Sequence, residues 1–566
     1  MGEAVDNNCF EKNLLALSAR NPELCSRLSA AQKIPGRYTF SESRTGRVIA
    51  LLADTGGPSR ALHSTVDPVK EAERLVSSLA GSDSPASENF SVFPGLGAGF
   101  LPQAALDSGR ASGVLVIDYD IDGITELFSS IDYTAILCDP RVTLLIDPSG
   151  ELIEKTILES YHPALHGGIR VMPLRARTES DKKFFDAAGN AIQRAIEKVS
   201  SDYSVQAHFG KRWFANIIRN LVHARFQDYS VPHVSEAALI AAGPSLDEQL
   251  LFLAERKERA GEALFVIAAD TALPALLGQG LKPDAVVSID CQHISYYHFI
   301  GQACGDVPLF LDLASPPELS AFSDYPVFFS GGHPLSLYIS QKWRPFPVLD
   351  TSGGNVTYAC LSLAESLGAR RISVYGADFS YPGGRVYAKG TYIYRFFEGK
   401  QERRFPLEAQ RSSFLYRSPF LPPEAEDAGH CYETTALRFY RKSFEQKASA
   451  MEAEVAAIPG SGMPLMIHRK ASARLTGREK SAPCFNAAGK ALMSAAEFLR
   501  QYRRDIENCG PHGGPVFTTL MPLAAAVKHR RPELSTPDII EAAKLHCIEE
   551  IDRVLDLKHE RSITHK

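Results

Sequence analysis

One stretch, from Ala237 to Asp247, constrains the fold of this 566-residue chain more than any other. It reads Ala-Ala-Leu-Ile-Ala-Ala-Gly-Pro-Ser-Leu-Asp, so small and apolar residues run directly into a Gly-Pro-Ser turn. Leucines then follow at helical spacing, at Leu246, Leu250 and Leu253. The stretch therefore predicts a buried strand, a tight turn and a helix.

The predicted turn, Gly243-Pro244-Ser245, lies at the N-terminus of that helix. Exposed backbone N–H groups and the positive end of the helix dipole favour an anion there, commonly phosphate. Gly243 allows a ligand to approach the backbone, and Ser245 can cap the helix or donate its hydroxyl. The alternative is a plain strand-to-helix connection within an α/β domain.

Strand-like apolar segments recur downstream, and helical segments separate several of them. We expect strands at 238–241, 264–268, 285–289, 309–311, 327–329 and 372–375. Apolar strands that alternate with helices predict a parallel sheet covered on both faces. The fold class is therefore α/β, with a central doubly wound, Rossmann-like domain whose ligands bind at the carboxyl ends of the strands.

Three acidic residues follow predicted strands, namely Asp270, Asp290 and Asp378. Equivalent positions at the end of one sheet favour a shared site, although each residue alone could be a solvated loop carboxylate. Ser352-Gly353 opens a further predicted helix at the same edge. Two helix N-termini at one edge would suit a nucleotide phosphate and its sugar.

A second glycine pattern lies in the N-terminal part of the chain. Gly95-Leu96-Gly97-Ala98-Gly99 follows a predicted strand, and the next predicted strand, 114–117, ends in Asp118. A glycine-rich turn with an acidic residue about 20 positions later is typical of nucleotide or S-adenosylmethionine sites. The alternative is a structural turn that binds no ligand.

Pattern and composition divide the chain into four parts. We expect an N-terminal Rossmann-like α/β domain at 1–180, a helical linker at 181–230, a central domain at 231–440 and a helical region at 441–566. Helices are expected at 185–199, 213–226 and 536–557, and the clearest ones at 434–456 and 490–506. From Asp378 to about Glu433 the chain is irregular and rich in Tyr, Phe and Arg, which is typical of a lid or binding loop.

Charge and cysteine usage exclude several classes of function. A net charge of -5 gives no basic excess for nucleic acid, so no nucleic-acid partner is expected. The ten cysteines are scattered without a Cys-x-x-Cys pair, which argues against a structural zinc and favours reduced thiols in the cytoplasm. No segment approaches ~18 consecutive apolar residues, so no membrane-spanning helix is expected.

Several of these motifs together resemble a known domain. They are Gly-Pro-Ser-Leu-Asp after a strand, Lys282-Pro283-Asp284 before Asp290, and Ser352-Gly353 through Gly376-Ala377-Asp378-Phe379. The domain is shared by the motility accessory factors, which are proposed flagellin glycosyltransferases, and by archaeal 6-hydroxymethylpterin diphosphokinases. Chain length and the segment His63-Ser64-Thr65-Val66-Asp67-Pro68 favour the motility accessory factors.

The same region is more distantly similar to bacterial sialyltransferases that use a cytidine-monophosphate (CMP) sugar. The resemblance implies that Gly243, Pro244, Ser245, Ser352 and Gly353 bind the nucleotide. It also implies that Tyr381 and Tyr387 hold the departing phosphate and that His430 is the catalytic histidine; His293, His298 and His333 are less well placed. Asparagines of those enzymes correspond to positions near Ala242, Asp270 and Asp290, so the nucleotide is open to question.

The resemblance implies transfer of a nonulosonic acid from a CMP-activated donor to Ser or Thr hydroxyls of flagellin, in the cytoplasm. No tightly bound cofactor is then expected. One alternative is ATP-dependent diphosphate transfer to a hydroxymethylpterin, in which Asp270 and Asp290 would hold Mg²⁺. Another is a non-catalytic accessory protein of flagellar assembly.

Overall fold

The chain folds into two units, Met1–His208 with Met521–Ala542, and Phe209–Leu520 with Ala543–Lys566. The computed structural model describes residues 7–31, 36–53, 59–78, 89–224, 230–231, 233–302, 304–422, 431–468, 485–486, 490–510 and 514–563. Three helices contribute to both units: α10 (Lys182–Asn220), α19 (Pro515–Arg530) and α20 (Thr536–Ile563).

The N-terminal unit is built on a parallel sheet with the strand order β6-β5-β4-β7. Its strands are β4 (Asn89–Pro94), β5 (Ala111–Asp118), β6 (Val142–Ile146) and β7 (Gly168–Val171). A small antiparallel sheet holds β1 (Tyr38–Glu42), β2 (Val48–Leu52) and β3 (Arg60–Ala61). The helices are α1 (Asn7–Ser18), α2 (Pro22–Ala30), α3 (Pro68–Ser78), α4 (Phe100–Asp107), α5 (Ile121–Ser130), α6 (Thr134–Cys138), α7 (Gly150–Ser160), α8 (Pro163–His166) and α9 (Arg175–Thr178).

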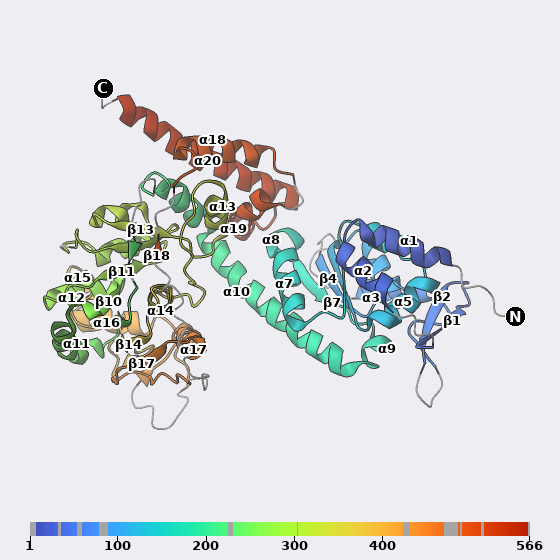
Figure 1. Ribbon diagram of the computed structural model, residues 1–566, viewed down its shortest axis with the longest axis horizontal. Coiled ribbons are helices and arrows are strands. Elements are labelled where there is room, and N and C mark those ends of the chain that lie inside the picture. The colour runs from blue at the N-terminus through green and yellow to red at the C-terminus, as the bar shows by residue number, and fades with distance from the viewer. Residues whose placement is uncertain are drawn as a thin grey trace. The chain divides into compact units, whose positions relative to one another are not determined.

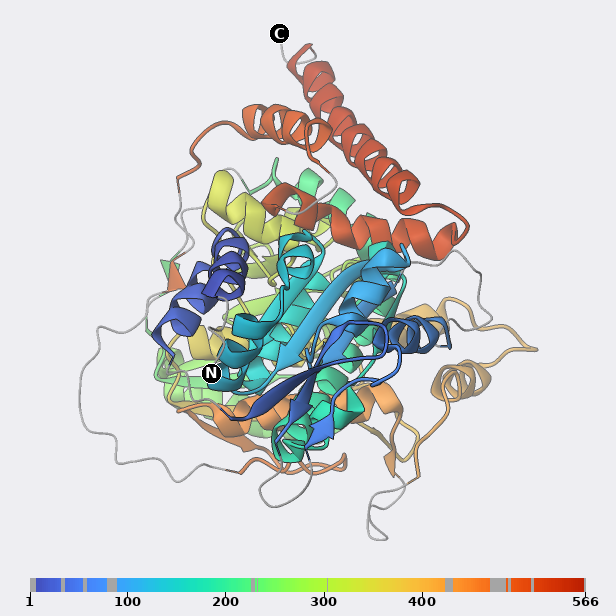
Figure 2. The same ribbon diagram turned by 90° about the vertical axis from the view of Figure 1, so that its right-hand side faces the viewer.

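Alternate residues of β4 and β5 face two separate hydrophobic cores. Phe93, Val114 and Val116 belong to the core that includes residues of α1, α2 and α5. Val92, Leu115 and Ile117 belong to the core shared with α7 and α10. This is the period-2 burial of a sheet covered on both faces. Figure 2 shows α1 and α2 beside the strands of this sheet, all in shades of blue.

The central unit is built on a seven-stranded parallel sheet with the order β13-β12-β11-β10-β9-β14-β17. Its strands are β9 (Glu236–Ile240), β10 (Leu264–Ala269), β11 (Ala285–Ser288), β12 (Leu309–Asp312), β13 (Pro326–Phe329), β14 (Arg371–Tyr375) and β17 (Glu454–Ala457). In Figure 1, α11 (Leu246–Ala260) and α12 (Leu273–Gly278) lie on one side of these strands, and α14 (Val356–Ser366) and α17 (Thr435–Ala450) on the other. The predicted α/β, Rossmann-like fold class is confirmed.

Strand order reverses between β9 and β14, the two neighbours at the middle of the sheet. From β9 the chain winds outward through β10 to β13, and it then returns to β14 on the other side. In open parallel sheets this reversal is where ligands usually bind. Gly243 follows β9 and Asp378 follows β14, so both lie at the reversal.

Local pattern misplaced several other elements. The helix expected at 185–199 and the first part of that expected at 213–226 belong to the single helix α10, which ends at Asn220. The helix expected at 434–456 ends at Ala450, and Glu454–Ala457 forms β17, which pairs with β14. The irregular segment after Asp378 holds β15 (Tyr381–Pro382), α15 (Tyr392–Glu398), α16 (Leu407–Leu415) and β16 (Cys431–Tyr432).

The remaining elements surround the central sheet or form its connections. Two-residue strands β8 (Ser230–Val231) and β18 (Phe485–Asn486) pair with each other. The 3₁₀ helices are η1 (Gly261–Ala263), η2 (Asp270–Ala272), η3 (His293–His298) and η4 (Pro317–Phe322), and the other helices are α13 (Pro334–Lys342) and α18 (Ala495–Glu507).

Candidate functional site

The Gly243-Pro244-Ser245 turn receives a carboxylate from its own chain. The backbone N–H of Ser245 donates to Oδ2 of Asp378 at 2.8 Å, and the Ser245 hydroxyl donates to Oδ1. Both side chains are buried. The anion predicted at the N-terminus of α11 is therefore Asp378 in this structure.

Gly243 and Gly376 allow the two loops to meet at this point. A Cβ on Gly243 would collide with the Asp378 carboxylate and the Gly376 carbonyl, and one on Gly376 would collide with the Ala241 carbonyl. The Gly243 N–H donates to the Gly376 carbonyl at 2.8 Å. Close packing inside the chain thus explains these glycines without a ligand.

A segment after β17, residues 458–463, crosses the same turn. The Ser461 N–H donates to the Ser245 hydroxyl at 2.7 Å, and the Met463 N–H donates to the Asp378 carbonyl at 3.0 Å. The Gln249 amide donates to the carbonyls of Ile458 and Pro459. Ser245 therefore ties α11, the loop after β14 and the segment after β17 together.

Ser245→Ala is expected to lower the free energy of unfolding by about 1–3 kcal/mol, because it removes the hydroxyl that donates to the buried Asp378 carboxylate and accepts the Ser461 N–H. Urea denaturation followed by circular dichroism measures this loss. Ser340→Ala is the matched control, since that hydroxyl bonds only within its own helix. Equal stability of the two variants would contradict the tying role of Ser245.

Asp270 and Asp290 form a carboxylate pair at the ends of β10 and β11. Asp270 is fully buried, and it accepts the Ser288 hydroxyl at 2.6 Å and the Thr271 N–H at 2.6 Å. Asp290 is half-buried and accepts the Gln292 N–H at 2.9 Å. Burial raises the pKa of Asp290, and the charge of Asp270 raises it further. The two predicted carboxylates are therefore neighbours.

Tyrosines from three elements surround this pair. Burial raises the pKa of Tyr387 and of Tyr392, and the negative charge of Asp270 raises both further. Burial and the charge of Asp290 raise the pKa of Tyr440, on α17. Tyr381 belongs to the same hydrophobic cluster as Tyr387. The structure thus brings Tyr387, Tyr392, Asp270 and Asp290 together, and Tyr381 packs beside Tyr387.

The segment that carries these tyrosines has its own packing. Tyr381, Val386 and Leu415 form a small hydrophobic core with Tyr387, and β15 pairs with β16. The Ala388 N–H donates to the Ala242 carbonyl at 2.9 Å, which fixes the segment beside the turn after β9. Of the predicted tyrosines, Tyr387 is thereby held over the carboxyl edge of the sheet.

The Ser352-Gly353 turn reaches the same neighbourhood through Tyr440. A Cβ on the next residue, Gly354, would lie 3.2 Å from the Tyr440 ring, whose pKa Asp290 influences. A Cβ on Gly353 would collide with the ring of Tyr358, whose hydroxyl donates to Asp350 at 2.7 Å. Gly353 therefore gives the ring room to bind Asp350.

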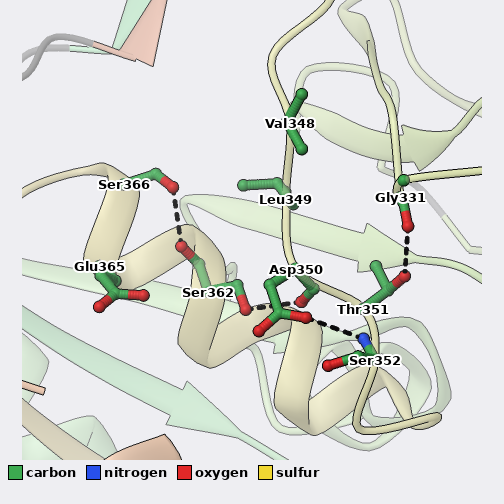
Figure 3. A pocket seen from close by; sticks show the side chains of 10 residues that line it. Gly331, Val348, Leu349, Asp350, Thr351, Ser352, Ser362, Glu365 and Ser366 are labelled. Carbon is green, nitrogen blue, oxygen red and sulfur yellow. Dashed lines mark hydrogen bonds between the residues drawn. The ribbon is translucent and has the colours of Figure 1, made fainter. Parts of the chain in front are cut away.

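A cavity of about 530 Å³ lies beside this turn. Figure 3 shows Asp350, Thr351 and Ser352 entering it from the loop, and Ser362, Glu365 and Ser366 from α14. Three hydroxyl groups of the cavity already donate to backbone carbonyls. Ser362 donates to the Asp350 carbonyl and Ser366 to the Ser362 carbonyl. Thr351 donates to the Gly331 carbonyl. The cavity thus presents hydrogen-bond acceptors, which suit a donor-rich group such as sugar hydroxyls.

Asp350 and Glu365 supply the negative charge of this cavity. Burial opposes ionisation of Asp350, but hydrogen bonds from Ser352 and Tyr358 and the charge of Lys447 lower its pKa to about 2. The Lys447 ammonium lies 3.4 Å from Asp350 and 3.0 Å from Glu365. One ammonium between two carboxylates leaves the cavity wall with a net negative charge.

Asp312 is a strand-end carboxylate that the sequence analysis missed. It ends β12 and is buried beneath Gly331, where a Cβ would collide with it and would lie 2.8 Å from the Thr351 hydroxyl. The missed signal was Leu309-Phe310-Leu311-Asp312, which repeats the pattern of an apolar strand that ends in Asp. Asp312 supports the loops around the cavity.

The four candidate histidines have different positions. His430 lies outside the described residues. His333 is buried against Trp213, with ring centroids 4.9 Å apart, and burial lowers its pKa to about 4. His293 stacks on Tyr296 at the start of η3. His298 packs on Tyr392, with ring centroids 4.6 Å apart, and its charge lowers the pKa of Asp290.

The N-terminal glycine turn is occupied by side chains of its own unit. The Leu96 N–H donates to Asp118 at 2.6 Å, and the Ala98 N–H donates to Nε2 of His63 at 2.8 Å. The Tyr133 hydroxyl donates to the Gly97 carbonyl at 2.5 Å. His63 belongs to the segment that favoured the motility accessory factors, so this segment helps to fill the turn.

Metal clusters and membrane-spanning helices are both absent from the described part of the chain. Within it, no group of three or more His, Cys, Asp or Glu side chains is placed to hold a metal ion. The helices in the same ranges include none that is long and apolar enough to cross a membrane.

Comparisons with known proteins agree with the sequence motifs. The family model of 6-hydroxymethylpterin diphosphokinase MptE-like proteins matches residues 211–384. One uncharacterized protein of Treponema pallidum (strain Nichols) is 40% identical over 120 residues, which are 21% of this chain and 42% of that protein. A second from the same organism is 32% identical over 176 residues, 30% of this chain and 80% of that protein. The chain thus spans less than half of the first relative.

The solved structure of the MAf glycosyltransferase from Magnetospirillum magneticum AMB-1 is similar over 97% of this chain and 90% of that chain, with a TM-score of 0.55 and 14% identity. The fold of this chain is therefore similar to that of this glycosyltransferase. The MptE-like match over residues 211–384 and this fold agree with the resemblance to the motility accessory factors that the sequence motifs indicate.

Proposed function

We propose that the protein is a cytoplasmic glycosyltransferase that moves a nonulosonic acid from a CMP-activated donor to Ser or Thr hydroxyls of flagellin. The observation that carries this proposal is the carboxylate and tyrosine cluster of Asp270, Asp290, Tyr387 and Tyr392, at the carboxyl edge of a sheet with a glycosyltransferase-like fold. Such an edge is where nucleotides bind in doubly wound folds.

The cluster offers separate groups for the two halves of the donor. Departure of CMP develops negative charge on its phosphate, which tyrosine hydroxyls can stabilise as donors. The Asp270 and Asp290 carboxylates would repel that phosphate, and they suit the ribose hydroxyls instead. The positive charge of Arg417 lowers the pKa values of Tyr387 and Tyr392, so a cation lies near enough to offset the repulsion.

The rest of the predicted site takes supporting roles in this proposal. Ser352 and Gly353 stand beside the acceptor-lined cavity, which we assign to hydroxyls of the transferred sugar. Asp378 already occupies the turn after β9, so the turn does not bind the phosphate in this proposal. It instead supports the sheet edge where the nucleotide would bind, through Gly243, Pro244, Ser245 and Asp378. His430 is the base that the sialyltransferase resemblance suggests.

Two measurements test the proposed function. Intact-mass analysis of flagellin from cells with and without the gene should show one nonulosonic acid mass per modified residue only when the gene is present. Purified protein should bind CMP in the absence of Mg²⁺.

Binding of ATP that requires Mg²⁺, with no change in flagellin mass, would favour the diphosphokinase alternative. The MptE-like domain and the Asp270 and Asp290 pair suggest that alternative. If the protein binds flagellin but shows neither sugar transfer nor diphosphate transfer, a non-catalytic accessory protein would be favoured.

Tyr387→Phe is expected to lower kcat on the order of 10²-fold, because it removes a hydroxyl donor to the leaving phosphate. The ring and its contacts with Phe414 remain, so the fold should be preserved. Initial rates of CMP release measure the effect. Tyr416→Phe is the control, because Tyr416 is an exposed residue of the same segment. Equal rates for both variants would remove Tyr387 from the catalytic site.

A further inference from the structure

His298 combines burial with an unpaired ring nitrogen. Its side chain is only 6% exposed, and Nδ1 has no hydrogen-bond partner among the described residues. Folded proteins rarely leave a buried polar atom unpaired, because this costs about 1–3 kcal/mol. A catalytic role is one explanation for such an exception. The sequence ranked His298 among the less well placed histidines.

The neighbours of His298 are those of the carboxylate and tyrosine cluster. Its ring meets the Tyr392 ring edge to face at 4.6 Å, and its charge acts on Asp290. The connection is local: β11 ends at Ser288, Asp290 follows, and η3 ends at His298. Packing of η3 against η2 keeps the histidine beside the loop that starts with Asp270.

We propose that His298 is the general base of the transfer and that Asp290 stabilises its protonated form. The proposal rests on the proposed function. As the acceptor oxygen forms its bond to the anomeric carbon, its proton moves to Nδ1 of His298. The bond between the anomeric carbon and the phosphate oxygen breaks, and CMP leaves with that electron pair. The imidazolium then releases its proton to water.

This arrangement matches what proton transfer requires. A histidine has a pKa near neutral pH, so it can accept and release a proton within one turnover. A neighbouring carboxylate stabilises the imidazolium, and a base of this kind contributes about 10²–10⁴-fold to a rate. His293 lies on the same short helix but stacks on Tyr296, and His333 packs on Trp213.

The test compares His298→Gln with His293→Gln in the full-length protein. We expect His298→Gln to lower kcat for transfer by at least about 10²-fold. The KM for the CMP-sugar and the affinity for CMP should stay within about twofold, because the base touches the acceptor and not the nucleotide. His293→Gln should transfer at the wild-type rate.

Chemical rescue separates proton transfer from a structural role. His298→Ala leaves a space for a small base, so added imidazole should restore part of its transfer rate. CMP affinity, measured on the same preparation, reports whether that variant is folded. Wild-type transfer by His298→Gln, or a loss of transfer confined to a parallel His430→Ala variant, would overturn the assignment and leave the glycosyltransferase function standing. Absence of transfer by the wild-type protein would instead reject the proposed function itself.

Discussion

Arg177→Leu is expected to lower the free energy of unfolding of the N-terminal unit by about 3–5 kcal/mol, because it leaves a buried carboxylate without its cation. The guanidinium of Arg177 lies 3.0 Å from Asp118, and both side chains are 0% exposed. The same guanidinium donates to the Tyr119 carbonyl at 2.9 Å and pairs with Asp181. No water can replace these contacts at a fully buried site without local unfolding.

Urea denaturation followed by circular dichroism measures this loss. Arg175→Leu is the matched control, because Arg175 lies exposed on the same short helix α9. The double variant Asp118→Asn with Arg177→Leu should recover part of the stability, since the carboxylate that needed the cation is gone. A loss no larger than that of the control would show that the pair does not hold the glycine turn.

Asp118 also shows why the N-terminal glycine pattern could not be interpreted from sequence alone. A carboxylate about 20 positions after the turn can bind a ribose or the turn itself. Here Asp118 accepts the Leu96 N–H of the turn, and Arg177 neutralises it. The decisive partner lies in another element, at a distance along the chain that no local motif specifies.

The central sheet was predictable because its strands are locally encoded. Six apolar segments were expected as strands, and each forms one, from β9 to β14. The seventh strand, β17, was expected to be helical, because Glu-Val-Ala-Ala carries little strand preference and its pairing with β14 is long-range. Two helices were expected where the structure has the single helix α10, because local sequence pattern does not reveal tertiary contacts.

The residues of the candidate site were predictable from the sequence, but which of them lie together was not. Strand-end acids were expected to share one site, and Asp270 and Asp290 do lie together. Asp378 instead binds Ser245 beneath a segment that arrives from after β17. The suitability of His298 as a candidate base could not be predicted from the sequence, because it depends on the burial of Nδ1 and on the contact with Tyr392.

The second large effect concerns the buried carboxyl group of Asp312. Its side chain is 6% exposed, and the groups that bind it are the backbone N–H groups of Ala314 and Gly331. Burial outweighs these hydrogen bonds and raises its pKa from 3.8 to about 7. Asp312 therefore titrates near neutral pH in the folded protein and near its ordinary value in the unfolded chain.

The raised pKa fixes the sign of the pH dependence. Below about pH 4 the carboxyl group is protonated in both states, so it contributes no pH dependence. Between pH 4 and pH 7 the unfolded chain loses this proton while the folded protein keeps it. The contribution of Asp312 to stability then falls by about 1.4 kcal/mol per pH unit, to a total of about 4 kcal/mol.

Asp312→Asn removes this titration. The free energy of unfolding of the variant, relative to the wild-type protein, is expected to rise by about 2–3 kcal/mol between pH 5 and pH 7. Guanidinium denaturation at pH 5, 6 and 7 measures the difference, in which costs independent of pH cancel. Asp324→Asn is the control, because Asp324 is exposed and should show no such change. Parallel pH profiles for wild type and Asp312→Asn would mean that the folded protein holds Asp312 ionised, with a cation or water at the cavity beside it.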